Sequence, residues 1–148
     1  MVTLRAPVGA AVAIVVCGGC LSAPSAKSHG PADSKCEWGT EPGDVQDVEI
    51  RTLVSDPSRY EGQVVGIVGH ADLGVERNAL YVSEDARERR LYEHAAQVWI
   101  AGVRADAPLL ELCNGRVLRV VGRVSVDSQA NPIWGARLRP AYRIEEVK

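Results

Sequence analysis

Few side chains in this sequence have the types and spacing that catalysis or metal binding requires. The histidines His29, His70 and His94 lie far apart, and there is no G-x-S-x-G elbow, H-E-x-x-H helix or Walker phosphate loop. His70 is expected on the outward face of a strand with no carboxylate beside it. We therefore expect no catalytic residue, no metal and no cofactor, and an enzyme ranks third among the functions considered.

Two tryptophans and four arginines are the residues best suited to binding. Tryptophan rings stack on bases, and arginine neutralises phosphate. If the strands that carry the arginines pair, the arginines share one outward face. This candidate ligand face comprises Trp99, Trp134, Arg119, Arg123, Arg137 and Arg139. The opposing interpretation packs both tryptophans inside and leaves the arginines in solvent. The formal net charge of −2 argues against a polyanionic partner, so nucleic acid is the runner-up.

The first twenty residues have the pattern of an export signal. Arg5 supplies a basic amino-terminal region, and an uncharged apolar run covers residues 6–16. That run is shorter than the roughly 20 residues that a membrane-spanning helix needs. The letters VCGGC at residues 16–20 place two small residues before a cysteine, and this run resembles a bacterial lipobox.

The lipobox resemblance implies removal of residues 1–19 and acylation of Cys20. Several acyl chains together hold a protein stably on a membrane. Cys17 departs from the pattern, because lipoboxes usually carry an aliphatic residue at that position, and plain secretion is the rival interpretation. We expect an extracytoplasmic protein anchored to a bacterial membrane, on its periplasmic side or at the cell surface.

Cys36 and Cys113 are the cysteines that remain in the mature chain without lipid, and an exported compartment permits a disulfide between them. The bond would close a loop of about 77 residues and stabilise the fold by ~3 to 5 kcal/mol. No C-x-x-C pair remains for metal or redox chemistry. Residues 20–44 are rich in Ser, Ala, Pro and Gly and read as a lipidated, flexible tether, which leaves 45–148 as the folded domain.

Two segments of this domain, residues 62–71 and 115–124, match one another and read as long strands. Both begin at a glycine, and both carry a glycine in mid-strand, Gly69 and Gly122. Such a glycine permits the bulge or bend that a small closed barrel needs. Further strands are expected at residues 79–83 and 97–101, with one or two more at 133–138 and 142–147. Helices are expected at 84–93 and 106–113, with short helical turns between residues 50 and 62.

Five to six strands with a helix before the fourth long strand match the Greek-key barrel of the oligonucleotide/oligosaccharide-binding (OB) fold. A small lipocalin-like or sandwich fold is the main competitor. The letters DPSRYEG at residues 56–62, ALY at 79–81 and VWI at 98–100 resemble bacterial exported lipoproteins with an OB-fold-like domain, a family with no assigned activity. The resemblance implies a fold and brings no catalytic residue.

The expected function is a membrane-tethered, non-catalytic binding module. Its partner would be another envelope protein, a saccharide or a small ligand, and an oligonucleotide-binding domain is the alternative. No motif in the sequence names the ligand.

Overall fold

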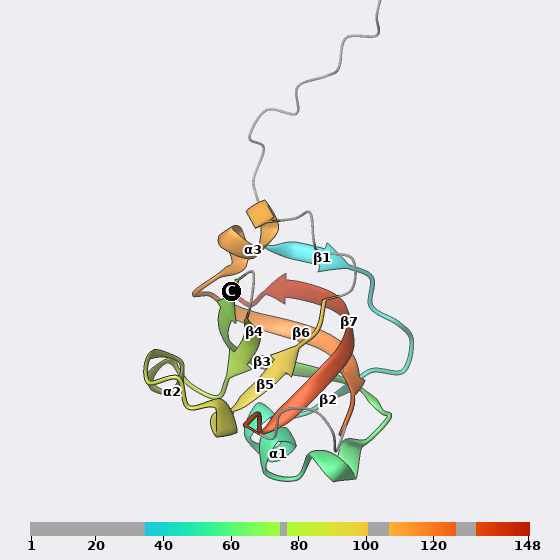
Figure 1. Cartoon of the computed structure of the whole chain (residues 1–148). Coiled ribbons are helices and arrows are strands. Elements are labelled where there is room, and N and C mark those ends of the chain that lie inside the picture. Colours follow the sequence, from blue (N-terminus) through green and yellow to red (C-terminus); the bar gives the residue numbers. More distant parts are fainter. Residues whose placement is uncertain (1–34, 75–76, 101–106, 127–132) are drawn as a thin grey trace, which may run out of the picture. The chain divides into compact units, whose positions relative to one another are not determined.

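Five strands close into a barrel in the computed structural model, which describes residues 35–74, 77–100, 107–126 and 133–148 (Figure 1). These strands are β3 (Val64–Leu73), β4 (Asn78–Tyr81), β5 (Ala95–Val98), β6 (Val117–Val124) and β7 (Ala136–Glu146). They pair in the circuit β3–β4–β5–β7–β6–β3, with β5 and β7 parallel and the other pairs antiparallel. Helix α3 (Ala107–Cys113) precedes β6. This architecture confirms the predicted OB-like barrel and excludes the lipocalin-like and sandwich alternatives.

Alternation along the strands builds the barrel interior. On β6, Leu118, Val120 and Val124 face inward and are fully buried, whereas Arg119 and Arg123 face outward. The two segments expected near the carboxyl end form one continuous strand, β7. Strand β5 begins two residues earlier than predicted, because the alanines at its start pair with β4.

Gly122 marks a bend in the barrel wall, as predicted. The pairing of β6 with β7 shifts register on both sides of this residue. A Cβ atom at Gly122 would lie 2.9 Å from the Leu138 Cβ and 3.0 Å from the Pro140 carbonyl oxygen. The absence of a side chain therefore allows the two strands to approach at the bulge.

The segment between β4 and β5 covers the outer face of these strands. Helix α2 (Glu84–Glu88) follows its N-cap Ser83, whose Oγ accepts a hydrogen bond from the Ala86 amide. The prediction of one helix over 84–93 is wrong, because α2 ends at Glu88 and the short 3-10 helix η2 (Tyr92–His94) follows. Arg90 adopts a positive φ of 53°, and the Leu91 amide then donates to the Ala86 carbonyl, which turns the chain back onto the barrel.

This returning segment builds a second small hydrophobic core on the outside of the barrel. Ala79 and Tyr81 of β4 and Ala95 of β5 point away from the barrel interior and are buried under α2 and its continuation. Leu91, Tyr92 and Trp134 pack against them. The outer face of β4 and β5 is thus occupied by the chain itself.

The folded unit begins earlier than residue 45, where the sequence suggested its boundary. Strand β1 (Glu37–Gly39) pairs with β7, and β2 (Gln46–Asp47) pairs with β3. The Sγ atoms of Cys36 and Cys113 are 2.08 Å apart, which confirms the predicted disulfide and ties the start of β1 to α3. The signal segment, Cys17 and Cys20 lie outside the described residues. Within the described part of the chain, no helix is long and apolar enough to cross a membrane.

Candidate functional site

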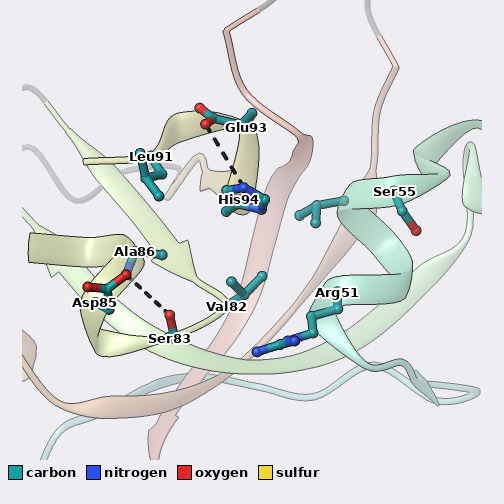
Figure 2. Close-up of a pocket in the computed structure, with 10 residues that line it drawn as sticks. Arg51, Ser55, Val82, Ser83, Asp85, Ala86, Leu91, Glu93 and His94 are labelled. Carbon is teal, nitrogen blue, oxygen red and sulfur yellow. Dashed lines mark hydrogen bonds and ion pairs between the residues drawn. The ribbon is translucent and has the colours of Figure 1, made fainter. Parts of the chain in front are cut away.

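A cleft of about 460 Å³ lies between helix α1 (Ile50–Ser55) and the segment that carries α2 and η2 (Figure 2). Its apolar lining comes from Val54, Val82, Ala86 and Leu91. Arg51, Ser55, Ser83, Asp85, Glu93 and His94 supply the polar lining. An apolar wall with a few polar groups at its rim is the usual composition of a small-molecule site.

Arg51 and His94 are the basic side chains that face this cleft. Figure 2 shows the Arg51 side chain extending from α1 across the opening and the His94 ring directed into the same space. Arg51 is exposed and forms no ion pair with any residue that the structure describes. The nearest carboxylate oxygen to the His94 Nε2 atom belongs to Glu93, at 4.0 Å, and both side chains are more than half exposed.

The backbone holds the walls of the cleft in place. The Val82 amide donates to the His94 carbonyl, and the His94 amide donates to the Leu91 carbonyl. Gly135 lies where α1 and η2 meet, since a Cβ atom there would be 2.5 Å from the Glu93 carbonyl oxygen and 2.8 Å from the Val54 Cβ. The glycine lets these elements approach closely enough to share one cleft.

His70 also helps to position this wall. Its Nδ1 atom lies 3.0 Å from a Glu84 carboxylate oxygen, so α2 is fastened to β3. The expectation that His70 has no carboxylate beside it is therefore wrong, because Glu84 reaches it from 14 residues away in the sequence. A hydrogen bond from Arg87 lowers the pKa of Glu84, which keeps the carboxylate ionised.

The candidate ligand face of the sequence analysis is distributed over three environments. Trp99 is 50% exposed, and the Arg139 guanidinium stacks 4.8 Å above its ring, so these two residues form an accessible pair beside β7. Trp134 instead packs edge-on against Tyr92 in the second core, with ring centroids 4.8 Å apart.

The arginines of this candidate face also lie in different environments. Arg119 lies in a network of carboxylates, and its side chain is only 17% exposed. Arg123 is exposed and donates to the Gly62 carbonyl oxygen. Arg137 pairs in register with Gln97 of β5 and is half-buried. The structure therefore brings Trp99, directly after β5, close to Arg137 and Arg139 of β7, and it places Arg119 and Trp134 among other partners.

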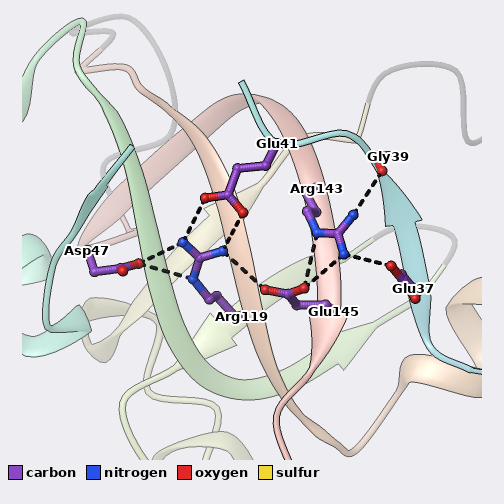
Figure 3. A network of polar contacts seen from close by, with 7 residues as sticks. All are labelled: Glu37, Gly39, Glu41, Asp47, Arg119, Arg143 and Glu145. Atoms are coloured by element: carbon purple, nitrogen blue, oxygen red, sulfur yellow. Dashed lines mark hydrogen bonds and ion pairs between the residues drawn. The ribbon is translucent and has the colours of Figure 1, made fainter. Parts of the chain in front are cut away.

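The carboxylate network around Arg119 extends to Arg143 (Figure 3). Arg119 donates to Glu41 and Asp47 at 2.9 Å and to Glu145 at 3.1 Å. Glu145 also accepts from Arg143, which in turn contacts Glu37 at 2.6 Å. Hydrogen bonding to Glu41 is the main reason that the pKa of Arg119 is raised, and the same bond lowers the pKa of Glu41. This network fastens the segment that contains β1 and β2 to the barrel wall.

The cleft was not predicted from the sequence. Its lining comes from two segments that are 27 or more residues apart, with Arg51, Val54 and Ser55 on one side and residues 82–94 on the other. Short apolar residues such as Val54 and Val82 have no signature that separates a cleft from a core. The one available signal was Arg51 on a short helix whose other side, Ile50 and Leu53, is apolar.

Among the described residues, no group of three or more His, Cys, Asp or Glu side chains is arranged to hold a metal ion. No family model matches this chain, and neither a curated protein nor a solved structure does. The assignment of the candidate site therefore rests on the contacts described above.

Proposed function

We propose that this chain is a membrane-tethered lipoprotein of the cell envelope whose barrel domain is a non-catalytic binding module for a small ligand. The lipobox-like run that ends at Cys20 supports the tether. The α1–α2 cleft carries the binding part of the proposal, because its volume of about 460 Å³ lies within the usual range of small-molecule sites.

The choice of a small ligand over an oligonucleotide follows from the environments of the basic residues. Single-stranded nucleic acid needs a basic groove with several exposed aromatic rings along it. Here Arg119 is neutralised by three carboxylates, and Trp134 is packed in the second core. The exposed Trp99–Arg139 pair is the one observation that favours the oligonucleotide alternative.

A fragment titration tests the binding site. Amide chemical shifts of the ¹⁵N-labelled exported protein would be followed with small acids, amines, amides and sugars, and separately with an oligothymidylate. We expect at least one class of fragment to shift residues of the cleft, including Val54, Val82 and Leu91. Shifts confined to Trp99 and Arg139 with the oligothymidylate would overturn the proposal in favour of the alternative.

The tether has its own test. In a bacterial host that processes lipoproteins, the wild-type chain should sediment with membranes, and its mature amino terminus should carry the mass of the acyl groups. Cys20→Ser should lose both properties, whereas Cys17→Ser should keep them. A wild-type protein that is unmodified and stays in the aqueous fraction would contradict the tether.

A further inference from the structure

We infer that the α1–α2 cleft takes small ligands in which a monoanionic carboxylate is attached to a branched aliphatic group; this inference rests on the proposed function. Arg51 forms no ion pair with the residues that the structure describes, although two carboxylates line the same cleft. Asp85 instead pairs with Arg89, at 3.3 Å.

The Arg51 guanidinium is therefore a cation at the cleft without a counter-ion from the described residues. A guanidinium binds a carboxylate through two parallel hydrogen bonds, which adds orientation to the attraction of charge. The His94 ring, directed into the same space, can donate a further hydrogen bond to the anion (Figure 2). Both contacts favour an anionic ligand over a neutral one.

The remaining rim charges favour a monoanion over a dianion. Glu93 lines the cleft beside His94, and Asp85 lines it on α2. Because Asp85 is paired with Arg89, the Glu93 carboxylate is the main source of repulsion, and it would repel a doubly charged phosphate monoester more strongly than a singly charged carboxylate. The site is thus matched to a carboxylic acid.

The apolar lining of the cleft determines which group should be attached to the carboxylate. Val54, Val82 and Leu91 are each half-buried, so they present part of their surface to the cleft. Covering that surface with a branched aliphatic group removes apolar area from water, which favours binding. A ligand with both parts contacts the rim and the wall at the same time.

Four probes separate these contributions: isovalerate, its neutral amide isovaleramide, acetate, and isoamyl phosphate. Each is titrated into the exported protein while the amide shifts of the cleft are followed. We expect isovalerate to bind at least tenfold more tightly than each of the other three.

N-acetyl-alanyl-leucine also ends in a carboxylate next to a branched aliphatic side chain, so it distinguishes a peptide carboxyl terminus from a free acid. Tighter binding than isovalerate supports a peptide as the source of the ligand, and weaker binding supports a free acid.

Arg51→Gln should reduce isovalerate affinity at least tenfold and leave isovaleramide affinity unchanged. Arg59→Gln is the matched control, because Arg59 is also exposed on a neighbouring short helix but does not line the cleft, and it should change neither affinity. Equal binding of the acid and the amide at the cleft would overturn this inference while the proposed site stands. Tighter binding of isoamyl phosphate would overturn the preference for a monoanion. A lack of cleft shifts with every probe would overturn the inference and, if the wider fragment set also fails, the proposed function.

Discussion

Tyr81 places a phenolic hydroxyl inside the second core. The residue is fully buried, and its hydroxyl oxygen has no hydrogen-bond partner among the described residues. Burial raises the pKa of Tyr81 to about 12, with a smaller effect from the nearby Asp72 carboxylate. The burial of Tyr81 shields this face of β4 and β5 from solvent.

Tyr81→Phe should therefore stabilise the protein by about 1 kcal/mol, because it removes a buried hydroxyl that is not hydrogen-bonded. The folded-state pKa lies above the ordinary value of 10, so the unfolded phenol ionises before the buried one, and the wild type loses stability as the pH rises from 10 through about 12. The advantage of the variant should grow above pH 10. Urea denaturation at pH 8 and pH 11 measures both effects. Tyr142→Phe, on a half-buried tyrosine of β7, is the control, and a Tyr81→Phe variant less stable than that control would contradict the account.

Arg119→Met tests the carboxylate network. The substitution keeps most of the aliphatic stem but leaves Glu41, Asp47 and Glu145 without their shared cation. We expect a loss of about 1 to 2 kcal/mol at pH 7. Because the pKa of Glu41 is lowered in the folded state, this difference should shrink as the pH falls below 4.5, where the carboxylate becomes protonated.

Arg89→Met is the control for Arg119, since its pair with Asp85 is exposed on both sides. Its loss should stay below about 0.5 kcal/mol. Chemical denaturation at pH 7 and pH 4 measures both variants. Equal losses at the two positions would show that the network does not hold the amino-terminal segment on the barrel.

At the scale of elements, the bulge at Gly122 is a requirement of barrel closure. Gly122→Ala should cost about 1 to 3 kcal/mol, because the added methyl group would press on the Leu138 side chain and on the backbone of β7. Gly43→Ala is the control, since no atom lies within 4 Å of a Cβ built there, and it should change stability by less than about 0.5 kcal/mol. Urea denaturation compares the two. A Gly122→Ala variant as stable as Gly43→Ala would contradict the role of the bulge.

The elements that the sequence predicts are those in which local pattern and tertiary environment agree. Strands β3 and β6 are long apolar segments that alternate with period two over part of their length, so their place in the barrel was recognisable. The end of α2 was not recognisable from the sequence, because it depends on the packing of Leu91 into the second core, which forms only when β4 and β5 pair. Strand β1 was missed for a similar reason: its three residues have no pattern of their own and are held by a disulfide and by Arg143.

The candidate site was less predictable than the fold. Aromatic and basic residues can be listed from the sequence, but the residues that they contact cannot. Arg119, for example, forms ion pairs with three carboxylates from distant positions in the chain. The cleft depends on the approach of α1 to η2 at Gly135, a contact between separate parts of the chain. Residue type therefore identified Trp99 and Arg139 as accessible candidates for binding, but it did not identify Arg51 as a residue of the cleft.

At the scale of the whole molecule, three parts of the chain have separate proposed roles. Cys20 is proposed to anchor, the residues after it to give reach, and the barrel to present its ligand site in the α1–α2 cleft. The barrel supports that cleft on one side through α1 and on the other through the segment that joins β4 to β5. The Trp99–Arg139 pair is a separate surface, formed by the residue after β5 and a residue of β7.

The most direct test of the central claim compares a variant that fills the cleft with one that removes the exposed tryptophan. Isovalerate would be titrated into the wild type, Val54→Trp and Trp99→Ala while amide chemical shifts are followed, after a thermal melt has shown each variant to be folded. Val54→Trp should abolish binding, because the new indole would occupy the cleft. Trp99→Ala should leave the affinity within about twofold of the wild type, because Trp99 does not line the cleft. Binding that survives Val54→Trp and is lost in Trp99→Ala would contradict the central claim.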